Sequence, residues 1–300
     1  MRANTVENSE AQAAGRYWDA HPISTGSVPY APGSQESFEA IYANWKATED
    51  DARRKFLESC RGKRVLEIGC GIGKDARYLA ENGVDYCGLD YSFRSVRMAQ
   101  DHLAWAGLAP RLLNADAATL PFRDGSFDLA FSIGVLHHIA DTPAGCRELL
   151  RVVRPGGTLR VMFYNRRSYH YALVAWLVCP LVWLLLKLPF LRGLLPLAPA
   201  KLRNLYAIAE RYGFSRARVL ATSADTSVAQ EDGFVRKTGF YTEAELRVLF
   251  AGAADFTFFC SDLKYFPLPF LRRFVEKHWG FFLTMTARKP ESAQRCESQS

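Results

Sequence analysis

Residues 65–73 read VLEIGCGIG, an apolar run followed by three glycines in five positions. The apolar run predicts a buried strand. The glycines predict a tight bend into the next helix, because a residue without a Cβ turns freely and lets a ligand approach the backbone. The dinucleotide-binding pattern is G-x-G-x-x-G, whereas the third glycine comes one residue earlier here. A dinucleotide site and a purely structural bend both remain open at this point.

Strands and helices alternate on either side of this bend. The predicted strands are 65–68, 84–89, 110–113, 127–133 and 158–163, and the helices between them cover 73–81, 92–106 and 141–153. This alternation predicts an α/β fold with a doubly wound, mostly parallel sheet. A helical stretch at 35–60 precedes it. The capping box TEAE at 242–245 begins a later helix, and two more strands follow at 255–260 and 280–287.

Acidic residues follow the second and third predicted strands. Asp90 comes 19 residues after Gly71, at a place where a carboxylate can accept both hydroxyl hydrogens of a ribose. NAD-binding enzymes use the same arrangement, and a solvated Asp at a strand end is the structural alternative. Asp116, in the sequence NADA at 114–117, can accept an adenine amine or cap a short helix. The sequence therefore favours a nucleoside ligand.

Four segments together resemble the class I S-adenosylmethionine-dependent methyltransferase superfamily, in particular its quinone-biosynthesis and general small-molecule members. They are VLEIGCGIGKD at 65–75, YCGLDYS at 86–92, NADAATLPFRDGSFDLAFSIGVLHHI at 114–139 and LLRVVRPGGTLRV at 149–161. The resemblance implies a Rossmann-like sheet of seven strands that ends in an antiparallel hairpin. It also implies S-adenosylmethionine as the cofactor.

The resemblance implies a role for each matched residue. The glycine bend supplies Glu67, Gly69, Cys70 and Gly71, where the methionine and ribose parts of the cofactor would lie. Asp90 would hold the ribose hydroxyls, Tyr91 would lie against the adenine, Asp116 and Ala117 would read the adenine edge, and Ile133 and Gly134 would lie under the sulfonium. Tyr17, with Trp18, would belong to an N-terminal lid whose aromatic faces suit a sulfonium cation. Packing against the sheet edge is the alternative.

Methyl transfer is a displacement at a carbon that positive sulfur already activates, so the protein chiefly aligns the nucleophile and excludes water. A general base is required only where the acceptor must lose a proton. His137 and His138 follow the fourth predicted strand, and we name them as candidate catalytic residues. A histidine that only shapes the pocket is the alternative. The cysteines form no CxxC pair, so no metal site is expected.

The most unusual segment follows the fifth predicted strand. Residues 172–186 are uninterruptedly apolar, and prolines stand at 180, 189, 196 and 199. A spanning helix needs about 20 apolar residues. Because Pro180 and Lys187 interrupt the stretch, we expect broken helices in 172–199 that wall an apolar pocket or touch a bilayer peripherally. A buried interface or cap core is the alternative. An aromatic connection at 264–279, with Tyr265, Phe266, Phe270, Phe274 and Trp279, also indicates an apolar acceptor.

The 300 residues suit one large domain or a domain with a cap. Five regions are expected: an N-terminal lid and helices at 1–60, a cofactor-binding core at 61–163, a hydrophobic, mainly helical cap at 164–238, the last helix and two strands at 239–288, and a disordered tail at 289–300. The first 15 residues are polar and lack the apolar stretch of a secretory signal. With seven irregularly spaced cysteines, we expect a cytoplasmic protein, membrane-associated at most peripherally.

The net charge of +7 is spread along the chain without a dense basic stripe, so no nucleic-acid partner is expected. The sequence predicts methyl transfer from S-adenosylmethionine to a small, apolar acceptor. The alternatives are a nicotinamide-dependent oxidoreductase, a non-catalytic methyltransferase-like partner protein, and other chemistry on the same cofactor, such as cyclisation triggered by methylation. The sequence does not decide the acceptor atom or the oligomeric state.

Overall fold

The computed structural model describes residues 15–22, 27–48, 50–224, 238–263 and 268–291. The tail at 289–300, which is expected to be disordered, lies largely outside these ranges. The chain divides into two compact units. The first unit comprises 1–162, 247–257 and 285–300, and the second comprises 163–246 and 258–284.

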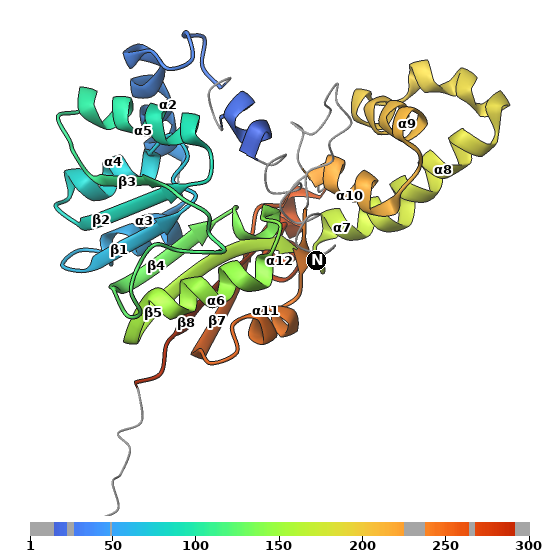
Figure 1. Ribbon diagram of the computed structural model, residues 1–300. Helices are drawn as coiled ribbons and strands as arrows, with labels where there is room; N and C mark the ends of the chain where they lie inside the picture. The colour runs from blue at the N-terminus through green and yellow to red at the C-terminus, as the bar shows by residue number, and fades with distance from the viewer. Residues whose placement is uncertain (1–14, 23–26, 49, 225–237, 264–267, 292–300) are drawn as a thin grey trace, which may run out of the picture. The chain divides into compact units, whose positions relative to one another are not determined.

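A single mixed sheet has the strand order β3-β2-β1-β4-β5-β8-β7, with β7 antiparallel (Figure 1). The predicted α/β class and seven-stranded, Rossmann-like arrangement are therefore confirmed. The strands are β1 (Arg64–Ile68), β2 (Asp85–Asp90), β3 (Arg111–Asn114), β4 (Phe127–Ile133), β5 (Val153–Asn165), β7 (Ala254–Ser261) and β8 (Phe282–Arg288). A two-residue strand, β6 (Phe240–Tyr241), also pairs with β5.

The parallel pairing of β1 with both β2 and β4 places the glycine bend at the centre of the sheet. Val65 pairs with Tyr86 of β2 and with Leu129 of β4. These central strands are apolar on both faces, as expected where helices cover the sheet on both sides. Val65, Leu129 and Phe131 are fully or almost fully buried in one cluster with Phe56 and other apolar side chains. The carboxyl ends of β1, β2 and β4 therefore meet at one edge.

Side chains cap the starts of several helices in the first unit. The helices of this unit are α2 (Gln35–Thr48), α3 (Asp51–Glu58), α4 (Lys74–Glu81), α5 (Phe93–Trp105), α6 (Thr142–Val152) and α11 (Glu243–Leu249), the last of which begins in the second unit. The hydroxyl of Ser92 caps α5, and the carboxylate of Asp141 caps α6. The helical stretch predicted at 35–60 is confirmed and consists of two helices, because Asp50 caps α3 by accepting a hydrogen bond from the Arg53 N–H.

The second unit is largely helical. Its elements are α7 (Tyr169–Leu173), a π-helical turn η2 (Val174–Val178), α8 (Cys179–Lys187), the 3₁₀ segment η3 (Pro189–Leu197), α9 (Ala200–Tyr212), α10 (Arg216–Ala224), η5 (Pro269–Leu271) and α12 (Arg272–Trp279). The broken helices expected in 172–199 are present, since the first helix ends at Lys187 and η3 and α9 follow it. Pro180 does not interrupt that first helix, which runs continuously from 169 to 187. The wide turn η2 lies immediately before Pro180 and relieves the clash of the proline ring with the preceding turn. Tyr265 and Phe266 of the aromatic connection lie outside the described residues.

Candidate active site

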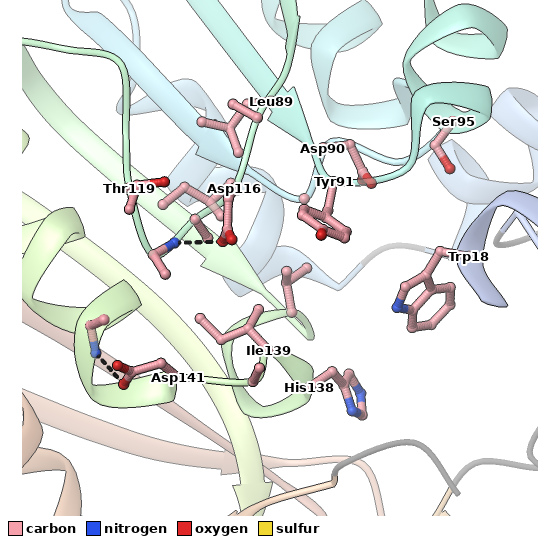
Figure 2. Close-up of a pocket in the computed structure, with 18 of the residues that line it drawn as sticks. Trp18, Leu89, Asp90, Tyr91, Ser95, Asp116, Thr119, His138, Ile139 and Asp141 are labelled. Carbon is pink, nitrogen blue, oxygen red and sulfur yellow. Dashed lines mark hydrogen bonds between the residues drawn. The ribbon is translucent and has the colours of Figure 1, made fainter. Parts of the chain in front are cut away.

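The first unit contains a cavity of about 440 Å³ at the carboxyl ends of the central strands. The glycine bend, the ends of β2 and β4, and the segments after β3 and β4 line it. In Figure 2, Asp90, Tyr91 and Asp116 lie toward one part of the cavity, and Trp18 and His138 lie near each other. Of the residues named from the sequence, nine line the cavity: Trp18, Gly69, Gly71, Asp90, Tyr91, Asp116, Ala117, Gly134 and His138.

The two glycines of the bend that line the cavity are required for different reasons. Both have positive φ, +83° at Gly69 and +53° at Gly71. A Cβ on Gly69 would collide with the side chain of Val135, so this glycine allows the segment after β4 to approach the bend. A Cβ on Gly71 would meet nothing within 4 Å. Gly71 therefore presents bare backbone to open cavity, where a ligand can approach it closely.

Asp90 joins the glycine bend to the start of α5. One carboxylate oxygen accepts the Gly71 N–H at 2.9 Å, and the other accepts the Ser92 N–H at 2.9 Å. Burial raises the pKa of Asp90 above its ordinary value of 3.8, and these backbone hydrogen bonds oppose that rise. The carboxylate is thus held rigidly at the cavity wall, where its remaining lone pairs suit the hydroxyl donors of a ribose.

Asp116 lines the same part of the cavity as Asp90 and Tyr91, and in Figure 2 it lies on the opposite side of Tyr91 from Asp90. One of its carboxylate oxygens accepts the Ala118 N–H at 2.8 Å, so Asp116 also stabilises its own turn, as the structural alternative required. Ala117 beside it is buried and lines the cavity. The ring of Tyr91 is partly exposed. A flat aromatic face beside a carboxylate and backbone amides suits the edge and face of a purine.

The N-terminal segment closes another part of the wall. Residues 15–20 are helical, and Trp18 lies with its ring centroid 6.2 Å from that of His138. Asp19 holds this helix in place, because its carboxylate accepts a hydrogen bond from the Ser92 hydroxyl at 2.7 Å and another from the Arg94 N–H at 3.1 Å. The same Ser92 receives support from Asp90, so the N-terminal helix is fixed to the end of β2.

Five residues named from the sequence do not line the cavity: Tyr17, Glu67, Cys70, Ile133 and His137. Tyr17 is buried and stacks on His21 with ring centroids 4.9 Å apart, while its neighbour Trp18 lines the cavity. Cys70 is buried beneath the bend. His137 is fully buried, and its ring centroid lies 4.0 Å from that of His138. Ile133 packs against the core cluster of β1 and β4.

Glu67 is buried behind the bend. Its carboxyl accepts a hydrogen bond of 2.5 Å from the Tyr86 hydroxyl. Burial and the nearby Asp75 carboxylate raise the pKa of Glu67 well above its ordinary value of 4.5, although the Tyr86 bond and Arg53 lower it. Asp75 is itself paired with the Arg53 guanidinium. This buried network supports the glycine bend from the side away from the cavity.

Sequence reasoning did not name several lining residues, among them Ser95, Thr119, Val135, Ile139 and Asp141. Asp141 begins the helix predicted at 141–153. It lines the cavity, and its carboxylate accepts the Ala144 N–H at 2.8 Å (Figure 2). Val135 follows β4 and lines the cavity only because Gly69 leaves room for its side chain. No local sequence signal marks such contacts, since they depend on how two loops meet.

The cavity fits an adenosyl cofactor. Small-molecule sites commonly enclose about 300–1,000 Å³ and combine apolar walls with a few fixed polar groups. Here Gly71 provides close backbone approach, and Asp90 and Asp116 provide acceptors at separate points. Within the described ranges, no group of three or more His, Cys, Asp or Glu side chains is arranged to hold a metal ion.

Comparison with known proteins supports this fit. Residues 66–161 match the family described as "Methyltransferase domain". Methyltransferase GfsG of Streptomyces halstedii is 38% identical over 148 residues, covering 48% of each chain. The 2-methyl-6-phytyl-1,4-hydroquinone methyltransferase of Synechocystis is 39% identical over 108 residues, covering 36% of this chain and 34% of the relative. The chain thus spans half or less of these curated relatives.

A solved structure agrees with the fold as well. The crystal structure of the [4+2]-cyclase SpnF matches this chain with a TM-score of 0.53 at 18% sequence identity, covering 94% of this chain and 97% of that one. At 18% sequence identity, this match shows a similar fold and does not show a shared function. The sheet order and the family match over β1 to β5 are therefore consistent with one another.

Proposed function

Because residues 66–161 form a class I S-adenosylmethionine-dependent methyltransferase domain, we propose that the protein transfers the methyl group of this cofactor to a small, apolar, lipid-like acceptor. One observation carries the proposal: a bend of bare glycine backbone faces a cavity whose wall holds Asp90 and Asp116. This donor and acceptor set suits an adenosyl group.

The residues of the cavity have distinct parts in this proposal. Asp90 accepts the ribose hydroxyls, Tyr91 and Asp116 bind the adenine, and Gly69 and Gly71 let the cofactor lie against the backbone. When bound, S-adenosylmethionine supplies a methyl group on a positively charged sulfur. Trp18 and the helix that carries it exclude water from that end of the cavity. The roles implied for Tyr17, Glu67, Cys70, Ile133, Gly134 and Ala117 remain predictions.

His138 is the proposed proton acceptor. It is buried, lines the cavity and lies beside Trp18, whereas His137 is fully buried and does not line the cavity. An acceptor that reacts through a hydroxyl or an acidic carbon must lose a proton, and an imidazole can take it near neutral pH. An acceptor that reacts through a neutral amine or a thiolate would not need His138 for the transfer itself.

An apolar acceptor is supported by two independent observations. Apolar side chains that follow β4, including Val135 and Ile139, line the cavity near His138. The Synechocystis relative is named for a phytylated hydroquinone. Such an acceptor would reside in a membrane, so we further propose that the protein is cytoplasmic with peripheral membrane contact through 172–199.

The proposal is tested by incubating the full chain with S-adenosylmethionine carrying a labelled methyl group and with either a prenylated hydroquinone or phosphoethanolamine. We expect label in the apolar product and release of S-adenosylhomocysteine, both reduced at least ten-fold in His138→Gln. His278→Gln is the control, since that exposed histidine lies in α12. Transfer to phosphoethanolamine alone would overturn the apolar acceptor. Binding of NAD in place of S-adenosylhomocysteine would overturn the reaction class.

A further inference from the structure

The helix Tyr169–Lys187 and the segment η3 expose several large apolar side chains. We define the apolar face as Trp176, Leu177, Trp183, Phe190, Leu194 and Leu197. Trp176 is 75% exposed, Phe190 is 76% exposed and Leu197 is 85% exposed. Soluble proteins scatter single apolar residues over their surface, but a contiguous run of them indicates a binding surface.

The other side of the same helix packs against the protein core. Val174, Cys179 and Val182 are buried, and they pack in one cluster with Leu205 of α9 and Val219 of α10. The helices α8 and α9 lie side by side in Figure 1. The helix is therefore apolar on two sides. One side packs against the protein core, and the other faces outward.

The charged residues of the segment that carries the apolar face are almost all positive. Residues 163–224 contain nine Lys or Arg and a single acidic residue, Glu210. Lys187 ends the helix on the same side as Trp176 and Trp183, since these positions are separated by seven and four residues. The guanidinium of Arg216 lies 5.1 Å from the centre of the Trp176 ring. Aromatic rings with flanking Lys and Arg are typical of surfaces that contact the headgroup region of a bilayer.

We propose that the apolar face docks into the interfacial region of an anionic lipid bilayer, which deepens the proposed function by naming the partner from which its apolar acceptor is drawn. The apolar side chains enter the boundary between headgroups and acyl chains. The excess of positive charge attracts anionic headgroups, so binding depends on both lipid charge and salt.

Docking in the interface fits the structure better than spanning. The helix has 19 residues and a mean hydropathy of 1.8, enough by length and composition to cross a membrane. However, α9 packs along it and carries Lys201, Arg203 and Glu210. A spanning helix would draw these charges into the hydrocarbon layer, which is strongly unfavourable. With α9 attached, the helix can bury only its outward side.

The test is co-sedimentation of the full chain with vesicles of phosphatidylcholine, alone or mixed with phosphatidylglycerol. We expect binding to the anionic vesicles at least ten-fold tighter than to the neutral ones, and a large loss of that binding at about 1 M salt, where the Debye length is ~3 Å. The double variant Phe190→Ser/Leu197→Ser should weaken binding to anionic vesicles at least ten-fold. No side chain of η3 is buried, so this variant should fold.

The matched control is Val248→Ser, which removes an apolar side chain that is 76% exposed on α11 and should leave binding unchanged. The proposal is overturned by absence of vesicle binding, by equal binding of the double variant, or by retention on membranes after alkaline carbonate washing, which indicates a spanning helix. It is also overturned if the double variant converts a dimer to a monomer without any vesicle binding by the parent. Binding of S-adenosylhomocysteine is also measured without vesicles. If the protein binds this ligand but not the vesicles, the docking proposal fails while the proposed function stands.

Discussion

The backbone N–H of Gly71 donates a hydrogen bond of 2.9 Å to the carboxylate of Asp90, 19 residues away in the sequence. This bond ties the glycine bend after β1 to the end of β2 at the wall of the cavity. The other oxygen of Asp90 accepts the Ser92 N–H, which also fixes the start of α5. One carboxylate thus organises three segments that meet where the cofactor is proposed to bind.

Replacing this carboxylate with an amide should weaken cofactor binding. Asp90→Asn can accept only one of the two backbone N–H groups, because its NH₂ group faces the other. Hydrogen bonds to charged groups contribute about 1.5–3 kcal/mol, so we expect the dissociation constant for S-adenosylhomocysteine to rise at least ten-fold by calorimetry. Asp128→Asn is the control, since Asp128 also accepts a backbone N–H, from Arg64, but does not line the cavity. Equal affinities in both variants would contradict the role of Asp90.

Loss of the Asp19 carboxylate should release the N-terminal helix. Asp19→Ala removes the hydrogen bonds from the Ser92 hydroxyl and the Arg94 N–H. We expect faster proteolysis within 15–22 and a dissociation constant for S-adenosylhomocysteine that rises about 5- to 30-fold, the equivalent of about 1–2 kcal/mol. Asp101→Ala, at an exposed position of α5, should change neither. An Asp19→Ala protein with the parent's cleavage rate and affinity would exclude this anchoring.

The buried carboxyl of Glu67 should impose a pH dependence on stability. Its folded-state pKa is raised above 4.5, so the folded protein holds a proton that the unfolded chain has released. The free energy of unfolding should therefore fall as pH rises above about 4.5, by up to about 1.4 kcal/mol per pH unit until the folded pKa is passed. Glu67→Gln should lack this slope in urea titrations, whereas the exposed-site variant Glu58→Gln should retain it. If the free energy of unfolding changed with pH in the same way in the parent, Glu67→Gln and Glu58→Gln, Glu67 would not be the source of the pH dependence.

Two buried thiols should resist alkylation in the folded protein. Burial raises the pKa of Cys60 to about 12 and that of Cys146 to about 12. Only the thiolate reacts, and its fraction at pH 8 is then on the order of 10⁻⁴. Peptide mapping after iodoacetamide treatment should find both cysteines unmodified in buffer and modified in guanidinium. Rapid labelling of either one in buffer would show that its part of the core opens readily.

The fold was predictable because each of its central signals is local. The strands around 65–68 and 127–133 are mostly apolar, and the caps Ser92, Asp141 and Thr242 mark helix starts through their own side chains. The resemblance added the number of strands and the antiparallel hairpin at the end of the sheet, which periodicity alone does not give. The helix across Pro180 was not predicted, because a π-helical turn that accommodates a proline has no sequence signal of its own.

The site was predictable where one segment decides it and unpredictable where two segments meet. Gly71 and Asp90 could be named because a glycine bend and a strand-end carboxylate have meaning by themselves. Val135 lines the cavity only because Gly69, 66 residues earlier, leaves room for it. Likewise, Tyr17 and Trp18 differ only in which side of a short helix they occupy, which the sequence before residue 20 does not determine.

The central claim, that bare backbone at Gly71 admits an adenosyl cofactor, is tested most directly by calorimetry of S-adenosylhomocysteine binding to Gly71→Asn and Gly83→Asn. Both glycines have positive φ with nothing within 4 Å of an added Cβ, and Asn tolerates this backbone region best among larger residues, so both variants should lose similar stability. Only Gly71 lines the cavity. We predict that Gly71→Asn weakens binding at least ten-fold while Gly83→Asn binds like the parent; equal binding by both variants would contradict the account.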